Sequence, residues 1–242
     1  MNTQQETLRR TALMPRYHAW IVDKVRQFLG ERILEVGCGT GAITGHLLAT
    51  GAHVVGVDIQ EDYLVLCRQT FAQSAFFTAR RCDVQSDEFR GLADLHPDTV
   101  MCSNVLEHIA DDQGAVCNMA DVLTPGGHMI IIAPALRWLW GSLDEGLSHC
   151  RRYEKHDMRQ LLEEAGLEVM VLRYFNLLGL LGWFVNGKLL RRRVLPGFQL
   201  RAYDCLVPVF RWIENTIRPH LGQSLIAVGR KPDAVSVPGN GS

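Results

Sequence analysis

The sequence predicts an α/β fold in which a mostly parallel β-sheet is covered by helices on both faces. Short apolar runs alternate with helix-like segments five times before residue 135, and the connections between them are short. The apolar runs are nearly continuous, which is typical of strands that are buried on both faces. A chain of 242 residues has room for one such domain with a modest elaboration.

The first half of the chain shows these elements in order. Residues 15–28 predict a helix, because Ala19, Val22 and Val25 fall on one face with polar residues between them. Further helices are expected at residues 42–50, 63–73 and 112–123. Strands are expected at residues 32–37, 52–58, 75–82, 99–103 and 128–133.

The second half is less regular. Its expected elements are a connection at residues 134–154, a helix at 156–165, a strand at 167–174, two helices within 176–209 and a strand at 224–229. We therefore expect one domain over residues 1–230, with a helical insertion at about 175–222 before the last strand. Residues 231–242 are expected to form a disordered tail.

Composition argues against several classes of protein. The net charge of −1 provides no basic excess for nucleic-acid binding. None of the seven cysteines forms a C-x-x-C pair, so zinc-ribbon and thioredoxin motifs have no support and no metal site is expected. The odd number of scattered cysteines favours a reducing compartment. The first ten residues lack an apolar signal segment, and the apolar run at 177–185 is far shorter than the roughly 20 residues of a membrane span. We expect a cytoplasmic protein.

A glycine-rich turn is the strongest functional signal. Gly37, Gly39 and Gly41 follow the first strand and open a helix, where a ligand can approach the main chain closely. Asp58 ends the second strand and could accept hydrogen bonds from a ribose. The pattern predicts a nucleoside cofactor in a Rossmann-like crevice. It leaves NAD open, because the run to Ala42 also reads G-x-G-x-x-A. A glycine turn that binds nothing is the structural alternative.

The residues around the glycines resemble the motifs of class I methyltransferases that depend on S-adenosylmethionine (SAM). The matching segments are ILEVGCGTG at 33–41, VDI at 57–59, CDV at 82–84, SNVLEHI at 103–109 and LTPGG at 123–127. Five matches in this order favour SAM over NAD. The resemblance covers residues 17–133 well and the terminal strands loosely. It implies a seven-stranded sheet whose last strand runs antiparallel.

The same resemblance implies that SAM lies across the carboxyl ends of the first four strands. The residues it assigns to the cofactor are Glu35, Gly37, Gly39, Gly41, Asp58, Ile59, Asp83, Val84 and Ser103. Tyr17 resembles an aromatic residue that closes over the methionine end of SAM in relatives. The alternative for Tyr17 is an aromatic side chain that packs the first helix against the sheet.

Three residues are candidates for a general base or an orienting group: His108, His149 and Tyr153. His108 lies after the fourth strand, where the methyl group of SAM should point, and imidazole titrates near neutral pH. The alternative for His108 and for Glu107 is to fasten the next helix. His149 and Tyr153 belong to an Asp-x4-His-x-Arg-Arg-Tyr run that starts at Asp144. This run resembles a segment of bacterial methyltransferases from glycan and natural-product loci.

Substrate binding is expected from the segment after the fifth strand. Arg151 and Arg152 could clamp a carboxylate or phosphate, or could pair with Asp144 or Glu145 and pin the loop. Trp138 is expected to line the substrate pocket.

The apolar insertion leaves four interpretations open. Residues 177–185 are very apolar and the basic triplet 191–193 follows them. They could form a hydrophobic substrate pocket, a buried lid, a dimer interface or a helix at an anionic membrane surface.

The leading functional prediction is transfer of a methyl group from SAM to an oxygen or nitrogen atom of a small metabolite, with hydrophobic and lipid-linked metabolites among the candidates. We expect a monomer or homodimer without a nucleic-acid partner. One alternative is a SAM-consuming enzyme with non-methyl chemistry, either cyclisation or aminocarboxypropyl transfer, that releases methylthioadenosine. The others are an RNA or protein methyltransferase and a non-catalytic SAM-fold protein.

Overall fold

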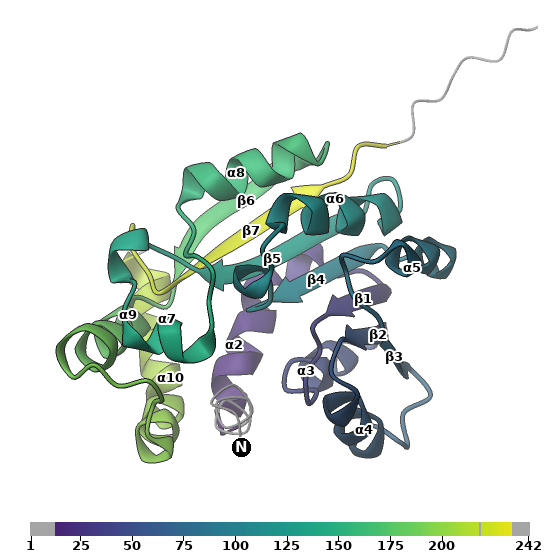
Figure 1. The fold of residues 1–242 in the computed structure, drawn as a ribbon. Helices are drawn as coiled ribbons and strands as arrows, with labels where there is room; N and C mark the ends of the chain where they lie inside the picture. The colour runs from purple at the N-terminus through teal and green to yellow at the C-terminus, as the bar shows by residue number, and fades with distance from the viewer. Residues whose placement is uncertain (1–12, 218, 234–242) are drawn as a thin grey trace, which may run out of the picture.

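The computed structural model of this chain describes residues 13–217 and 219–233. At its centre lies a seven-stranded sheet in the order β3-β2-β1-β4-β5-β7-β6 (Figure 1). The strands are β1 (Arg32–Val36), β2 (His53–Asp58), β3 (Phe77–Arg81), β4 (Thr99–Ser103), β5 (His128–Pro134), β6 (Glu168–Phe175) and β7 (Ser224–Arg230). β1 to β5 pair in parallel, and β7 runs antiparallel to both β5 and β6. The predicted mostly parallel sheet with an antiparallel last strand is therefore confirmed.

Helices cover both faces of the sheet. In Figure 1, α5, α6 and α8 lie above it, and α2, α3, α4 and α10 lie below it. The helices are α2 (Pro15–Val25), α3 (Thr44–Leu48), α4 (Glu61–Thr70), α5 (Asp87–Arg90), α6 (Asp112–Val122), α7 (Ser142–Leu147), α8 (Lys155–Glu164), α9 (Leu177–Trp183) and α10 (Gly197–Ile217). Short 3₁₀ or π segments are η1 (Arg26–Phe28), η2 (Gly91–Leu95), η3 (Leu106–His108), η4 (Arg137–Leu139) and η5 (Phe184–Leu189).

The core consists of two layers, one on each face of the sheet. Successive side chains of a strand point to opposite faces, so Ile33 packs in the layer with α2 and Leu34 in the layer with α6 and α8. Ile130 and Ile131 divide in the same way. Burial on both faces explains why these strands are apolar at nearly every position.

The observed elements depart from the predicted ones in three short segments. The helix predicted at 42–50 begins only at Thr44, because the chain up to Ile43 is still part of the glycine turn. α5 with η2 lies between β3 and β4, where no helix was expected. α7 lies within the connection predicted at 134–154. These helices are one or two turns long, which is too short to produce a hydrophobic period in the sequence.

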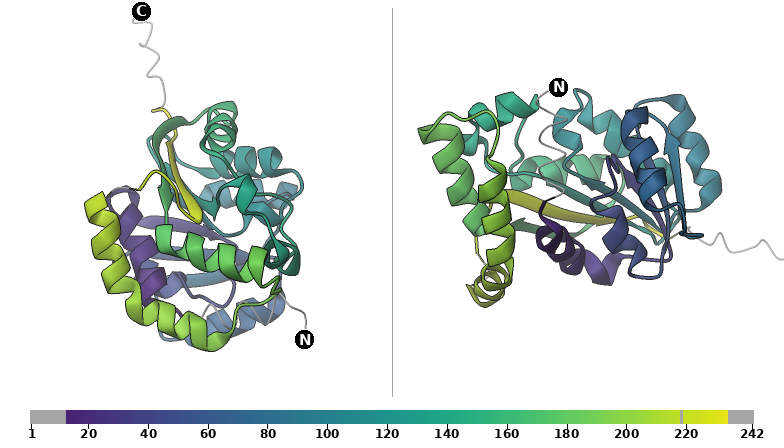
Figure 2. Two further views of the ribbon diagram at one scale, coloured as in Figure 1. Left: turned by 90° about the vertical axis from the view of Figure 1, so that its left-hand side faces the viewer. Right: turned by 90° about the horizontal axis from the view of Figure 1, so that it is seen from below.

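The segment between β6 and β7 is helical. α10 runs alongside α2 (Figure 2), and the Asp204 carboxylate accepts a hydrogen bond of 2.9 Å from the backbone N–H of Tyr17. α9 and η5 pack against α7, the helix that follows β5. This arrangement brings the insertion beside the carboxyl end of β5.

The contacts of the folded domain continue past residue 230, into the segment predicted as a tail. The Lys231 ammonium donates hydrogen bonds to the carbonyls of Ala120, Asp121 and Leu123 at the end of α6. Residues 234–242, the rest of the predicted tail, lie outside the described part, as do residues 1–12. Among the described helices, none is both long and apolar enough to cross a bilayer.

Candidate active site

The glycine turn after β1 is closed by backbone contacts. The N–H of Gly37 donates to the carbonyl of Val57 on the neighbouring strand, at 2.8 Å. Gly37, Gly39 and Gly41 have φ angles of 72°, 54° and 88°, a region that favours glycine. A β-carbon at Gly37 would lie 2.2 Å from a methyl carbon of Val105. Glycine is therefore needed here both for the turn and for the close approach of the segment after β4.

Asp58 joins the turns that follow β1 and β2. Its Oδ2 accepts a hydrogen bond of 2.9 Å from Gly39 N–H, and its Oδ1 accepts one of 2.8 Å from Gln60 N–H. Partial burial raises the pKa of Asp58 although both amide hydrogen bonds oppose the shift. Each carboxylate oxygen retains a lone pair that can accept a further hydrogen bond.

Glu35 is buried at the end of β1. The Thr44 hydroxyl donates a hydrogen bond of 2.6 Å to its Oε2. Burial raises the pKa of Glu35 to about 8, because no positive charge compensates the lost hydration. At neutral pH the protonated, uncharged form therefore prevails.

The other predicted cofactor residues follow β2, β3 and β4 at the same edge of the sheet. Ile59 and Asp83 are exposed and Ser103 is partly buried. Val84 is buried, and its carbonyl accepts a hydrogen bond of 2.8 Å from the Asn118 side chain. The structure thus brings these positions to the edge that carries the glycine turn.

Tyr17 lies in a buried aromatic cluster. Its ring stacks on Phe175 with centroids 6.0 Å apart and meets Tyr203 edge-on at 6.1 Å. The Asn176 side chain donates to its hydroxyl at 3.5 Å. Burial raises the pKa of Tyr17 to about 12. These contacts correspond to the packing alternative, in which the ring fastens α2 to β6 and α10.

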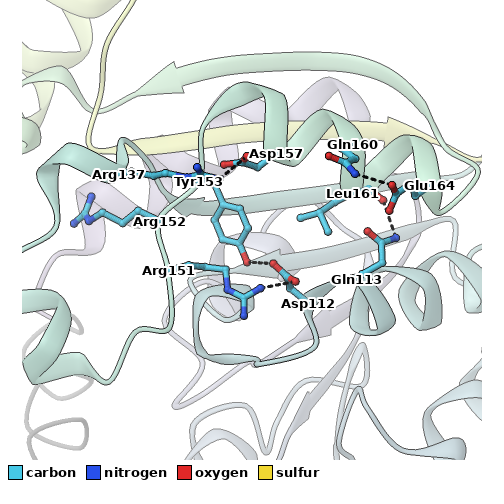
Figure 3. Close-up of a pocket in the computed structure, with 10 residues that line it drawn as sticks. All are labelled: Asp112, Gln113, Arg137, Arg151, Arg152, Tyr153, Asp157, Gln160, Leu161 and Glu164. Carbon is cyan, nitrogen blue, oxygen red and sulfur yellow. Dashed lines mark hydrogen bonds and ion pairs between the residues drawn. The ribbon is translucent and has the colours of Figure 1, made fainter.

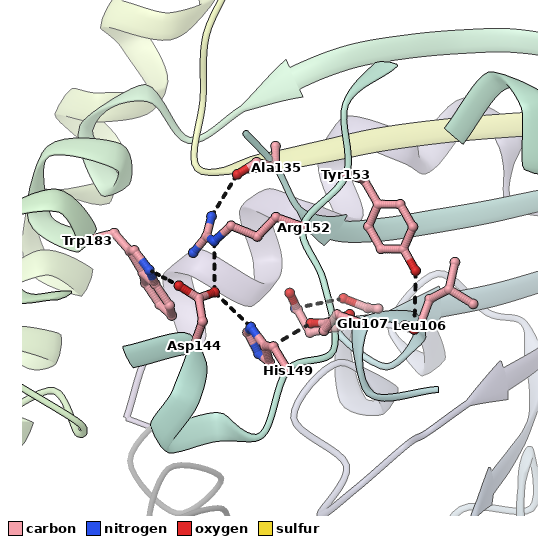
Figure 4. A network of polar contacts seen from close by, with 10 residues as sticks. Leu106, Glu107, Ala135, Asp144, His149, Arg152, Tyr153 and Trp183 are labelled. Carbon is pink, nitrogen blue, oxygen red and sulfur yellow. Dashed lines mark hydrogen bonds and ion pairs between the residues drawn. The ribbon is translucent and has the colours of Figure 1, made fainter. Parts of the chain in front are cut away.

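Asp144 is the centre of a buried polar network after β5 (Figure 4). Its Oδ1 lies 2.8 Å from Arg152 Nε and 2.9 Å from His149 Nδ1. Its Oδ2 accepts from the N–H of Gly141 at 3.0 Å and from the indole of Trp183 at 3.2 Å. Burial alone would raise the pKa of Asp144, but the His149 hydrogen bond and the Arg152 charge lower it. The Asp144 carboxylate is therefore ionised.

Glu107, His108 and His149 meet beside this network. The two imidazole rings lie 4.9 Å apart, and His149 Nε2 lies 3.9 Å from Glu107 Oε1. Burial raises the pKa of Glu107 to about 7. Burial and the neighbouring His149 lower the pKa of His108 to about 4. Two of the three predicted catalytic residues thus lie together, and a buried carboxylate joins them.

Tyr153 and Arg151 lie elsewhere, in a pocket of about 410 Å³ between α6 and α8 (Figure 3). Arg151 pairs with Asp112 at 2.5 Å and donates to the Ala110 carbonyl at 2.7 Å. The Tyr153 hydroxyl donates to the other Asp112 oxygen at 2.8 Å. Burial and Asp112 raise the pKa of Tyr153. This pocket is lined by the start of α6, by α8 and by residues of the segment after β5, and it includes no residue of the glycine turn.

The remaining predicted substrate residues are also separated. The guanidinium of Arg152 is committed to Asp144 and to the Ala135 carbonyl, at 2.7 Å. Trp138 is 48% exposed and lies 6.4 Å from the Phe184 ring. The sequence did not identify Trp183 as a partner of Asp144, because an indole in an apolar run is indistinguishable from a core residue.

Comparisons with known proteins show which families this chain is similar to. Residues 34–129 match a family model described as a methyltransferase domain. The ubiquinone biosynthesis O-methyltransferase of Aeromonas salmonicida is 30% identical over 112 residues, which cover 46% of this chain and 47% of that protein. The chain thus matches the curated relatives over about half of their length.

Solved structures share the fold over most of the chain. Phosphoethanolamine N-methyltransferase 2 of Haemonchus contortus, in complex with SAM, is 18% identical with a TM-score of 0.60 and covers 88% of this chain and 52% of its own. The [4+2]-cyclase SpnF is 15% identical with a TM-score of 0.58, and the shared part covers 91% of this chain and 82% of that one. At such identities the likeness concerns the fold alone. In its motifs, in the domain match over residues 34–129 and in its sheet topology, this chain is similar to class I, SAM-dependent methyltransferases.

Proposed function

We propose that this protein transfers the methyl group of SAM to an oxygen or nitrogen atom of a small, apolar acceptor. One observation carries the proposal: the glycine turn touches the segment after β4. A β-carbon at Gly37 would meet Val105, two residues before Glu107. Cofactor groups and candidate acceptor groups therefore share one edge of the sheet.

The residues at this edge suit the parts of SAM. Asp58 is positioned to accept hydrogen bonds from a ribose, and Asp83 to accept one from the adenine amine. Exposed Ile59 offers an apolar surface to the adenine ring. When bound, SAM supplies a methyl group already activated by its sulfonium. What the protein adds is alignment of the acceptor and exclusion of water.

We assign the orientation of the acceptor to His108 and His149 rather than to the arginines. Arg151 and Arg152 are both engaged in ion pairs within the chain, at 2.5 and 2.8 Å, and these pairs pin the loop after β5. The Tyr153 hydroxyl is committed to Asp112. The imidazole of His149, held by Asp144, is the polar group at this edge with a fixed orientation.

An oxygen acceptor is the form of the proposal that the relatives favour. The curated proteins that match this chain are named as O-methyltransferases of ubiquinone biosynthesis. Because the matched methyltransferase domain ends at residue 129, before α9 and α10, the acceptor of this chain has to be found by experiment.

We further propose that the insertion contacts an anionic membrane surface. Its exposed apolar side chains on α10 include Phe198 (72% exposed) and Trp212 (69%). The exposed charged side chains of residues 177–217 are Lys188, Arg191, Arg193, Arg201 and Arg211, all basic. The two acidic residues of this segment, Asp204 and Glu214, are buried. An apolar face with a basic rim complements anionic lipid.

Vesicle sedimentation tests this contact. The protein is expected to sediment with phosphatidylglycerol vesicles, weakly at high salt, and not with phosphatidylcholine vesicles. A Phe198→Ser/Trp212→Ser variant should remain in solution. Concentration-dependent dimerisation that this variant abolishes, without vesicle binding, would instead assign the face to a second copy of the chain.

The reaction itself is tested by product analysis. Incubation with SAM and cell extract should yield S-adenosylhomocysteine, whereas SAM alone should not, and an Asp58→Ala variant should lose the product. The alternative is a SAM-consuming enzyme with non-methyl chemistry, because a shared fold does not determine the reaction. Methylthioadenosine formed from SAM alone by the wild type would overturn methyl transfer and indicate chemistry on the aminobutyrate chain.

A further inference from the structure

Glu107, His108 and His149 bring three ligating atoms within 4.8 Å of one another. Two of them come from η3 after β4, and the third comes from the turn after α7. The 3.9 Å between Glu107 Oε1 and His149 Nε2 is too long for a hydrogen bond. Two atoms that share one metal ion at about 2.0–2.2 Å each stand roughly 3–4 Å apart. The observed separation fits such a pair.

An independent observation concerns the second oxygen of Glu107. Its side chain is 1% exposed, and Oε2 finds no hydrogen-bond partner among the described residues. A buried polar atom without a partner costs free energy, and native structures keep few of them without a reason. A cation beside the carboxylate would satisfy this oxygen.

The surroundings of His149 match those of a metal-bound imidazole. Its Nδ1 is hydrogen-bonded to Asp144 at 2.9 Å, which leaves Nε2 directed toward Glu107 (Figure 4). A carboxylate on the non-coordinating nitrogen is the usual outer partner of a ligating histidine. Asp144 is itself held by Arg152 and Trp183, so the ring is fixed before any ligand binds.

We propose that Glu107, His108 and His149 form a binding site for a divalent transition-metal ion of the Zn²⁺ type. One carboxylate and two imidazoles form the donor set of catalytic zinc sites, which keep an open coordination position. No zinc motif in the sequence indicates this site, because the third ligand comes from a different segment of the chain.

One consequence of the site rests on the proposed function. An acceptor hydroxyl at the open position would release its proton to water more easily. Its oxygen would then bond to the methyl carbon while the S–CH₃ electron pair returns to sulfur, which leaves a neutral thioether. Metal binding itself does not depend on this reaction.

Calorimetric titration of tag-free, chelator-treated protein with zinc chloride tests the site. The wild type should bind one equivalent and gain thermal stability. Glu107→Gln and His149→Ala should each weaken binding at least tenfold, because each removes one of three ligands. His156→Asn is the matched control, since this histidine is exposed on α8 and should leave the isotherm unchanged.

Cobalt absorption supplies a second measurement. Wild-type protein should show the visible bands of Co²⁺ bound by nitrogen and oxygen, and Glu107→Gln, which keeps the side-chain shape, should lose them. The site is overturned if folded wild type binds no zinc, or if it binds zinc with the same affinity as both variants. SAM binding measured in parallel separates the two proposals: SAM-dependent methyl transfer without zinc binding would remove the metal site alone.

Discussion

Two buried carboxylates at the same edge of the sheet have opposite charge states. Glu35 is 5% exposed and has one neutral partner, the Thr44 hydroxyl, and burial raises its pKa to about 8. Asp144 is fully buried, yet its pKa lies below the usual range, because His149 and Arg152 outweigh the burial. Burial therefore does not decide ionisation, and the partners of each carboxylate do.

The regions around these carboxylates are also held together differently. The glycine turn is fastened by backbone hydrogen bonds between adjacent strands, such as Gly37 N–H to the Val57 carbonyl. The Asp144 network joins side chains that are up to 39 residues apart in sequence. The first region should therefore be sensitive to backbone conformation, and the second to loss of a single charge.

Asp144→Ala should have the largest effect on stability. The variant leaves the Arg152 guanidinium buried without its counter-charge, and we expect a loss of about 3–5 kcal/mol in the free energy of unfolding. Urea denaturation measures it. Glu163→Ala, which removes an exposed pair with Arg159, is the control and should cost at most about 0.5 kcal/mol. Similar losses in both variants would refute the special role of the buried network.

The ionisation of Glu35 should have the next largest effect on stability. The pKa of Glu35 in the folded protein, about 8, exceeds the ordinary value of 4.5. The contribution of protonated Glu35 to the stability of the fold is therefore complete below pH 4.5 and is lost as the pH rises through 8. The effect amounts to about 1.4 kcal/mol per unit of pKa difference. Unfolding at pH 5, 6.5 and 8 should show the wild type losing stability relative to Glu35→Gln. Parallel pH profiles would mean that Glu35 is ionised in the fold.

Gly37→Ala tests whether the stability of the glycine turn depends on its backbone conformation. Residue 37 has a positive φ of 72°, and the added β-carbon would meet Val105. We therefore expect a loss of about 2–3 kcal/mol in the free energy of unfolding and weaker SAM binding. Gly51→Ala is matched in φ, at 91°, but has nothing within 4 Å, and should cost about 1 kcal/mol. Denaturation and calorimetry compare them. Equal losses would show that the contact with Val105 is unimportant.

Tyr153→Phe should have the smallest effect. It removes the hydrogen bond of 2.8 Å to Asp112 and should cost about 1 kcal/mol. SAM affinity and turnover should change less than threefold, because the hydroxyl lies in the pocket between α6 and α8. Loss of turnover with unchanged SAM affinity would restore the catalytic role predicted for Tyr153 from the sequence.

Much of the fold could be predicted because its signals are local. The strands β1, β2, β4 and β5 are apolar runs bounded by turns, and the bounds predicted for β4 are those observed. The glycine turn and Asp58 lie within one strand-helix-strand unit, so their spacing in the sequence already brings them together. The position of Tyr17 could not be predicted in this way, because its neighbours Phe175 and Tyr203 come from the other end of the chain.

By itself, the sequence determined the strands, the glycine turn and the type of cofactor, since the pattern of each strand and motif depends on residues close together along the chain. Only the tertiary structure decided which polar residues meet. It separated Tyr153 and Arg151 from His149, although the three are near neighbours in sequence, and it joined His149 to Glu107. The physical reason is that successive residues of a loop point in different directions, whereas parallel strands deliver distant segments to one edge.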